Sequence, residues 1–207
     1  MKTITTILLF LTTIFLASCS LSPIPTAPLS TYTITNWPKK TIVAPKTFSR
    51  KTILVTTPIA SPGYNSAAMI YVTIPYQLRA FADHSWIAPP AQLLLPLIAN
   101  RLRATGDFRA VVTSPFSGVA NYQLNTQLLT LQQEFLQPVS RVRLTMEATL
   151  INTATDRVIA SRVFEAVIPA PDNNPYAGVL ATNAAAHRIV NQIARFVAER
   201  ASMKLPS

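Results

Sequence analysis

RVRLTMEATL, at residues 141–150, is the stretch of sequence that decides the fold. Apolar side chains occupy every second position, and polar side chains fill the positions between them: Val142, Leu144, Met146, Ala148 and Leu150 alternate with Arg141, Arg143, Thr145, Glu147 and Thr149. Because successive side chains of a β-strand point to opposite faces of a sheet, this alternation predicts a strand with one buried face and one wet face.

The alternation also places Arg141 and Arg143 together on the wet face. We interpret this pair as a candidate docking surface for an acidic partner or for anionic head groups. The alternative interpretation is that the two arginines only keep the sheet surface solvated.

The segments on either side predict partner strands. Residues 122–135 alternate in part between apolar and polar side chains, residues 152–156 carry turn residues, and residues 157–168 form a second apolar-rich run. The three runs together predict an antiparallel meander. Further strands are expected at residues 32–34, 52–57, 68–74, 77–82 and 108–113.

Two helices complete the predicted fold. Pro89 and Pro90 suit the first turn of a helix, because the N–H that proline lacks would be unpaired there, and Gly106 is a natural stop. Residues 177–203 carry an apolar stripe at helical spacing. We therefore predict an α+β fold in which a largely antiparallel sheet is covered on one face by two helices.

The N-terminus has the layout of a secretory signal peptide. Lys2 provides a positive charge, residues 4–17 are apolar, and small residues lead into Cys19. The apolar run is shorter than the roughly 20 residues that a membrane-spanning helix needs, so cleavage is favoured over retention. Residues 16–19, Leu-Ala-Ser-Cys, also resemble the bacterial lipobox, in which the cysteine is acylated and the chain is cut before it.

The sequence therefore predicts a signal peptide at residues 1–18 and a lipid anchor on Cys19. Residues 19–31 are the lipidated N-terminus and a tether rich in proline and serine, of which the twelve residues 20–31 span up to about 37 Å when extended. Ser20 follows the cysteine, whereas an aspartate there favours retention in the inner membrane of well-studied Gram-negative bacteria. We expect an outer-membrane lipoprotein that faces the periplasm, rather than an inner-membrane one.

Residues 32–203 are enough for one domain with its own core. Cys19 is the only cysteine of the chain, so the folded part can contain neither a disulfide nor a thiolate metal site. The formal net charge of the whole chain is +10. Export separates the protein from nucleic acid, so head groups or an acidic protein are the expected partners, and a merely solvated basic surface is the alternative.

Candidate catalytic residues are few. The two histidines, His84 and His187, exclude a histidine-rich metal site, and the sequence contains no HExxH, phosphate-loop or GxSxG motif. Residues 83–85, Asp-His-Ser, have the residue types of a triad, but triads are assembled by geometry rather than by adjacency, and a turn is the expected structure. We assign no catalytic residue, no metal and no cofactor.

Several motifs appear in an order that resembles a known family. They are Trp86-x-x-Pro89-Pro90-x-x-Leu93-Leu94, Gly106-x-Phe108, Tyr122-x-Leu124, Phe135 and Asn183. With the lipoprotein start, this order resembles the ABC-type transport auxiliary lipoprotein family, whose best-known form is the paraquat-inducible protein C type. The resemblance spans residues 32–198.

The resemblance implies a non-catalytic accessory subunit of a lipid-transport system. Its partners would be a mammalian-cell-entry (MCE) domain protein and, in some systems, an ABC permease and ATPase, and its role would be to support phospholipid transport and outer-membrane integrity. The resemblance is also compatible with a homo-oligomer. Trp86 is a candidate partner contact, although packing of the turn is the favoured interpretation. Two other classes stay open: an envelope-assembly or lipopolysaccharide-handling lipoprotein, and a lipoprotein hydrolase.

Overall fold

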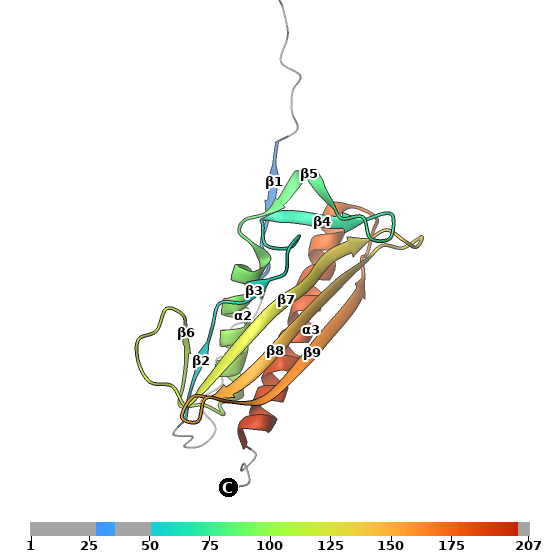
Figure 1. Cartoon of the computed structure of the whole chain (residues 1–207). Coiled ribbons are helices and arrows are strands. Elements are labelled where there is room, and N and C mark those ends of the chain that lie inside the picture. Colours follow the sequence, from blue (N-terminus) through green and yellow to red (C-terminus); the bar gives the residue numbers. More distant parts are fainter. Residues whose placement is uncertain (1–27, 36–50, 203–207) are drawn as a thin grey trace, which may run out of the picture.

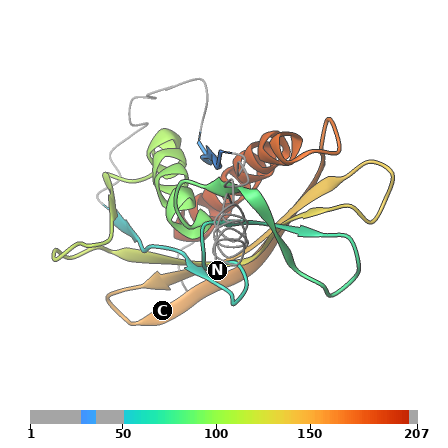
Figure 2. The same ribbon diagram turned by 90° about the horizontal axis from the view of Figure 1, so that it is seen from above.

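The computed structural model describes residues 28–35 and 51–202, and within these ranges it is an open mixed sheet with two helices (Figure 1). The strands are β1 (Ser30–Tyr32), β2 (Thr52–Val55), β3 (Ile59–Ala60), β4 (Ala68–Val72), β5 (Arg79–Trp86), β6 (Ala110–Thr113), β7 (Tyr122–Glu134), β8 (Arg141–Asn152) and β9 (Arg157–Pro169). The helices are α2 (Pro90–Thr105) and α3 (Pro175–Ser202). Seen from above, both helices cover the same face of the sheet (Figure 2). The α+β prediction, with its largely antiparallel sheet and two helices on one face, is confirmed.

Strand β7 lies in the middle of the sheet and pairs with other strands along both of its edges. One edge of β7 pairs with β8 along its whole length, and β8 pairs with β9, so the predicted antiparallel meander is confirmed. The other edge of β7 pairs in succession with β2, β3 and β4, all three in parallel. These parallel pairings follow from contacts between distant segments and were not part of the sequence prediction.

The burial of β8 follows the alternation of its sequence. Its apolar side chains, from Val142 to Leu150, are at most 1% exposed, whereas the residues between them are half-buried on the opposite face. We call this opposite face of β7, β8 and β9 the wet face. Its register is fixed by the sequence pattern, since a slip of one residue would turn every core side chain outward.

Each helix begins and ends for a local chemical reason. Pro89 and Pro90 stand at the start of α2, and Gly106 ends it in the left-handed conformation with its N–H bonded to the Arg103 carbonyl. Asn174 caps α3, because its Oδ1 accepts a hydrogen bond of 2.8 Å from the Ala177 N–H. Both helix ends that the sequence predicted for α2 are confirmed.

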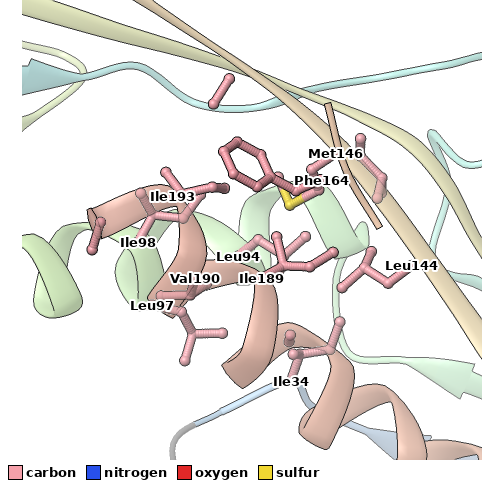
Figure 3. Close-up of a cluster of buried hydrophobic side chains, with 14 of the residues drawn as sticks. Ile34, Leu94, Leu97, Ile98, Leu144, Met146, Phe164, Ile189, Val190 and Ile193 are labelled. Carbon is pink, nitrogen blue, oxygen red and sulfur yellow. The ribbon is translucent and has the colours of Figure 1, made fainter. Parts of the chain in front are cut away.

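The core lies between the helices and the sheet (Figure 3). Leu94 and Ile98 of α2 and Ile189 and Ile193 of α3 meet Leu144 and Met146 of β8 there, together with further buried side chains: Ile34, Leu97, Phe164 and Val190. Burial of these side chains is the main stabilising term available, because the folded part has no cysteine.

One local prediction is wrong. The turn expected at residues 83–85 is part of β5, whose last three residues, His84 to Trp86, pair in parallel with β1. Pairing with a distant segment overrides the local turn signal there. Trp86 ends β5 with 4% of its surface exposed and belongs to the core, which agrees with the favoured interpretation that it packs in the domain.

Candidate functional site

The predicted anchor, Cys19, lies outside the described residues, as does the predicted signal peptide. The described chain begins at residue 28, two residues before β1. The described site residues are therefore those of the wet face and those around β1.

An ionic cluster of Glu134, Arg141, Arg143 and Glu165 lies on the wet face. Arg141 Nε and Arg143 Nε donate to the two carboxylate oxygens of Glu134, at 2.9 and 2.7 Å. Arg143 Nη1 also donates to Glu165 Oε1 at 2.7 Å. The Glu134 side chain is only 5% exposed, so the two arginines cover it. The strand register produces this cluster, because Glu134 of β7 stands directly opposite Arg141 of β8.

The electrostatics of the cluster favour the charged forms. Burial alone would raise the pKa of Glu134, but hydrogen bonds from Arg143, Gln132 and Arg141 outweigh it and hold the pKa below its ordinary value. The Glu134 carboxylate in turn raises the pKa of Arg143. The cluster contains two arginines and two glutamates, so its formal charge is zero.

The structure thus brings Arg141 and Arg143 together as the sequence predicted, and it adds a feature that the sequence did not reveal. Their guanidinium groups bond to carboxylates of the same domain, so less positive charge is available to an acidic partner than the sequence alone implied. The periodicity of β8 cannot show this, because Glu134 lies on another strand and at its end.

We expect Glu134→Gln to lower the free energy of unfolding by about 1–3 kcal/mol at pH 7, since it removes the charged acceptor of two arginines. Because the folded-state pKa of Glu134 is lowered, its contribution is complete above the unfolded-state value of about 4.3 and is lost as the pH falls through the lower folded-state value. The difference in stability between the wild type and Glu134→Gln should therefore become smaller below pH 4. Thermal melts at several pH values measure it.

Glu147→Gln is the matched control, since Glu147 lies on the same face and accepts one hydrogen bond, from Ser161. We expect it to change the melting temperature less than Glu134→Gln does. A difference in stability between the wild type and Glu134→Gln that stays constant down to pH 3 would contradict the proposed ionic role.

A row of aromatic rings links β1 to the body of the domain. Tyr32 of β1 stacks on His84 of β5 with ring centroids 5.9 Å apart, and Tyr176 of α3 lies 6.1 Å from Tyr32. The row continues from His84 to Phe81 and from there to Phe135. His84 therefore packs within this row and bonds to the adjacent Asp83 at 2.7 Å. Such ring contacts join four separate segments, so no local sequence signal could have predicted the row.

A small pocket lies beside this row, between the sheet and the start of α3. It has a water-accessible volume of about 10 Å³, room for about one water molecule. Its lining comes from β4, β5, β7 and α3: Met69, Ile70, Phe81, Trp86, Leu131, Gln132, Gln133, Gly178 and Thr182. The buried Gln133 Oε1 has no hydrogen-bond partner among the described residues, and it approaches Gly178 so closely that a Cβ there would lie 2.1 Å away. Gly178 therefore leaves room for the Gln133 amide, which would have to shift to make space for a larger residue.

The remaining chemistry of the described residues is sparse. No group of three or more metal-ligating side chains occurs among residues 28–35 and 51–202. His187 contacts Asn191 on the exposed side of α3, at 3.1 Å. Neither helix of the described part is long and apolar enough to cross a membrane.

The polar side chains described above pack within the domain or join hydrogen-bond and ionic networks on its surface. The family model of the ABC-type transport auxiliary lipoprotein component matches residues 32–194, well over half of the chain. The chain belongs to this family, and it is accordingly a transport auxiliary lipoprotein of the bacterial envelope. No curated protein matches the sequence.

Solved structures share the fold. A Xanthomonas campestris protein, XCC0632, is 18% identical with a TM-score of 0.72, and the match covers 84% of this chain and 97% of that one. An uncharacterized protein of unstated source is 13% identical with a TM-score of 0.64, covering 83% and 99%. The hypothetical protein CT253 from Chlamydia trachomatis is 8% identical with a TM-score of 0.50, covering 74% and 99%. At these identities the likeness shows the fold alone.

Proposed function

We propose that the protein is the non-catalytic accessory subunit of an MCE/ABC-type lipid transport system. It is held in the outer membrane by acylated Cys19, faces the periplasm, and supports phospholipid transport and envelope integrity. The observation that carries this proposal is the family match over residues 32–194, combined with the signal peptide and cysteine that the sequence predicts.

The structure supports a role in binding rather than in reaction. Asp83, His84 and Ser85 follow one another in β5; the His84 ring bonds to Asp83, and no hydrogen bond joins it to Ser85 in the part of the chain that the structure describes. The imidazole of His84 packs against Tyr32, which holds β1 in place. A lipoprotein hydrolase would need a nucleophile and a base on a common face, so the accessory role is the better-supported reading.

The wet face is our proposed docking surface for the MCE-domain protein. Arg141 and Arg143 lie there, and each keeps about 30% of its side chain exposed, at 31% and 28%. An acidic partner would compete with Glu134 and Glu165 for their donors, so the contact would be of moderate strength and sensitive to salt.

Co-purification tests this function. Full-length tagged protein, crosslinked in cells and isolated in detergent, is expected to recover an MCE-domain protein. Arg141→Gln with Arg143→Gln is expected to reduce the recovery several-fold and to make the cells sensitive to detergent, with a larger effect at low salt than at high salt. Arg157→Gln, an exposed arginine at the start of β9, is the matched control and should change neither measurement.

Unchanged recovery with the double variant would remove the wet face as the docking surface. Recovery of lipopolysaccharide-assembly components in place of an MCE-domain protein would favour the envelope-assembly alternative. Detergent sensitivity caused by His84→Ala alone, at normal abundance and melting temperature, would favour the hydrolase.

A further inference from the structure

Two loops of the domain expose apolar side chains and carry no charge. They are residues 73–78, between β4 and β5, and residues 135–140, between β7 and β8, and we call them the uncharged loops. Their exposed side chains are Ile74, Tyr76, Leu78, Leu136 and Val139. In a chain with a formal charge of +10, twelve loop residues without a charged side chain form a surface that loses little by leaving water.

Tyr76 stands at the tip of the first loop in an unfavourable conformation. The Gln77 N–H donates to the Ile74 carbonyl at 3.1 Å, which closes a turn with Pro75 and Tyr76 at its centre. Tyr76 has a φ of 67°, and this third position of a turn usually carries glycine. Its side chain is fully exposed, at 103%. The fold therefore gains nothing from this tyrosine that glycine would not provide, so its use lies outside the domain.

The uncharged loops lie next to each other. The Phe135 N–H donates to the Val72 carbonyl at 2.8 Å, and the Phe135 and Tyr71 rings lie 6.1 Å apart. Both views show the two loops side by side at the right-hand edge of the domain, in the half of Figure 1 that also contains β1 (Figures 1 and 2). The aromatic row from Phe135 through Phe81 and His84 to Tyr32 joins them to β1.

An arginine follows each loop directly. Arg79 begins β5, with its guanidinium 5.9 Å from the centre of the Tyr71 ring, and Arg141 begins β8. Arg141 is already paired with Glu134, so Arg79 is the cation that this surface offers to head groups. Apolar side chains at a tip, aromatic rings behind them and an arginine further back are the arrangement of a surface that lies in a membrane interface.

We propose that the uncharged loops insert into the surface of the bilayer in which Cys19 is anchored. Tyr76, Ile74 and Val139 enter the region between head groups and acyl chains, and Arg79 lies at the level of the phosphates. This inference rests on the proposed anchoring of Cys19 for its proximity to lipid, and it adds a second, reversible contact between the folded domain and the membrane.

The distance from the anchor favours the bilayer over a protein as the occupant. Ten residues separate Cys19 from Ser30, and an extended chain of that length spans about 31–34 Å, so the end of the domain that contains β1 stays close to the lipid. The exposed side chains stand on protruding loops rather than in a groove, which suits a soft interface better than a preformed protein surface.

Fluorescence quenching tests the proposal on the full-length lipoprotein. Acylation blocks Cys19, so Gln77→Cys introduces the only free thiol, and an environment-sensitive dye is attached there. The protein is reconstituted in vesicles of phosphatidylethanolamine and phosphatidylglycerol that contain a lipid with a nitroxide on its upper acyl chain. The dye at residue 77 is expected to be quenched at least several-fold more than a dye at Val119→Cys, which is also an exposed site and lies in the loop between β6 and β7.

The variant Tyr76→Gly in the Gln77→Cys background separates insertion from folding. Glycine suits the positive φ, so the melting temperature is expected to hold or rise, while quenching falls toward the Val119→Cys level. Equal quenching at residues 77 and 119, with the protein floating on the vesicles, would overturn loop insertion and leave the anchor intact. A chain that neither incorporates palmitate nor floats would overturn both. Shielding of the dye by a co-purified MCE-domain protein in detergent, without quenching by lipid, would assign the loops to a protein contact and overturn the membrane proposal.

Discussion

Leu144→Asp is expected to unfold the domain. Leu144 is fully buried on β8, opposite Leu131 of β7 and Ala166 of β9, and it lies in the core beneath α3 (Figure 3). An aspartate there loses the apolar contacts of leucine and brings an unpaired carboxylate into the core. The combined cost is about 5 kcal/mol or more, comparable to the whole stability of a typical domain.

Thr145→Asp is the matched control, one residue away on the wet face. The new carboxylate faces Glu165 across the strand pair, so a loss of about 1 kcal/mol or less is expected, which neighbouring Arg143 partly offsets. Circular dichroism melts and soluble yield measure both variants. Equal losses would show that the buried and wet faces of β8 are wrongly assigned.

Cys19→Ser is expected to abolish lipid attachment completely. Only a thiol forms the thioether of a bacterial lipoprotein, and Cys19 is the only cysteine in the sequence. Incorporation of labelled palmitate should fall to background, and the uncleaved precursor should accumulate. Because each buried acyl CH₂ contributes about 0.8 kcal/mol to membrane binding, loss of the acyl chains removes most of the anchoring.

Ser20→Cys in the Cys19→Ser background tests whether position matters as well as chemistry. It restores a thiol one residue away from the predicted cleavage site, and we expect it to recover little of the labelling. Palmitate incorporation by Cys19→Ser at the wild-type level would disprove the lipoprotein start.

The sequence was most informative where one residue type repeats with a fixed period. The strict alternation at residues 141–150 predicted β8 and its buried face, because side-chain direction in a strand depends only on position, and the flanking runs predicted its antiparallel partners. The proline start and glycine end of α2 are local effects of the same kind. In contrast, β3 contains only two residues and exists because β7 offers an edge to pair with, so no local pattern could indicate it.

In the candidate site, too, local features could be predicted from the sequence and contacts between distant segments could not. The shared face of Arg141 and Arg143 could be predicted from their spacing, but their pairing with Glu134 depends on where β7 ends relative to β8. Burial of Trp86 was the favoured interpretation, but its place at the end of a strand could not be predicted, since that depends on the pairing of β1 with β5. The glycine inside the long helix α3, at residue 178, is a local signal of the close approach of Gln133.

The unequal edges of β7 set how the sequence can change length over evolution. On the β8 side, twelve residues of β7 pair, and the register shifts once, between Leu128 and Thr130; an added residue that is not accommodated by such an irregularity would turn the following side chains to the wrong face. On the other side β2, β3 and β4 each hold β7 through only two or three residue pairs, separated by connecting segments. An insertion in those connections leaves every pair intact, because the long strand remains a continuous template. We therefore expect the domain to tolerate insertions in these N-terminal connections better than insertions within the paired residues of the C-terminal meander.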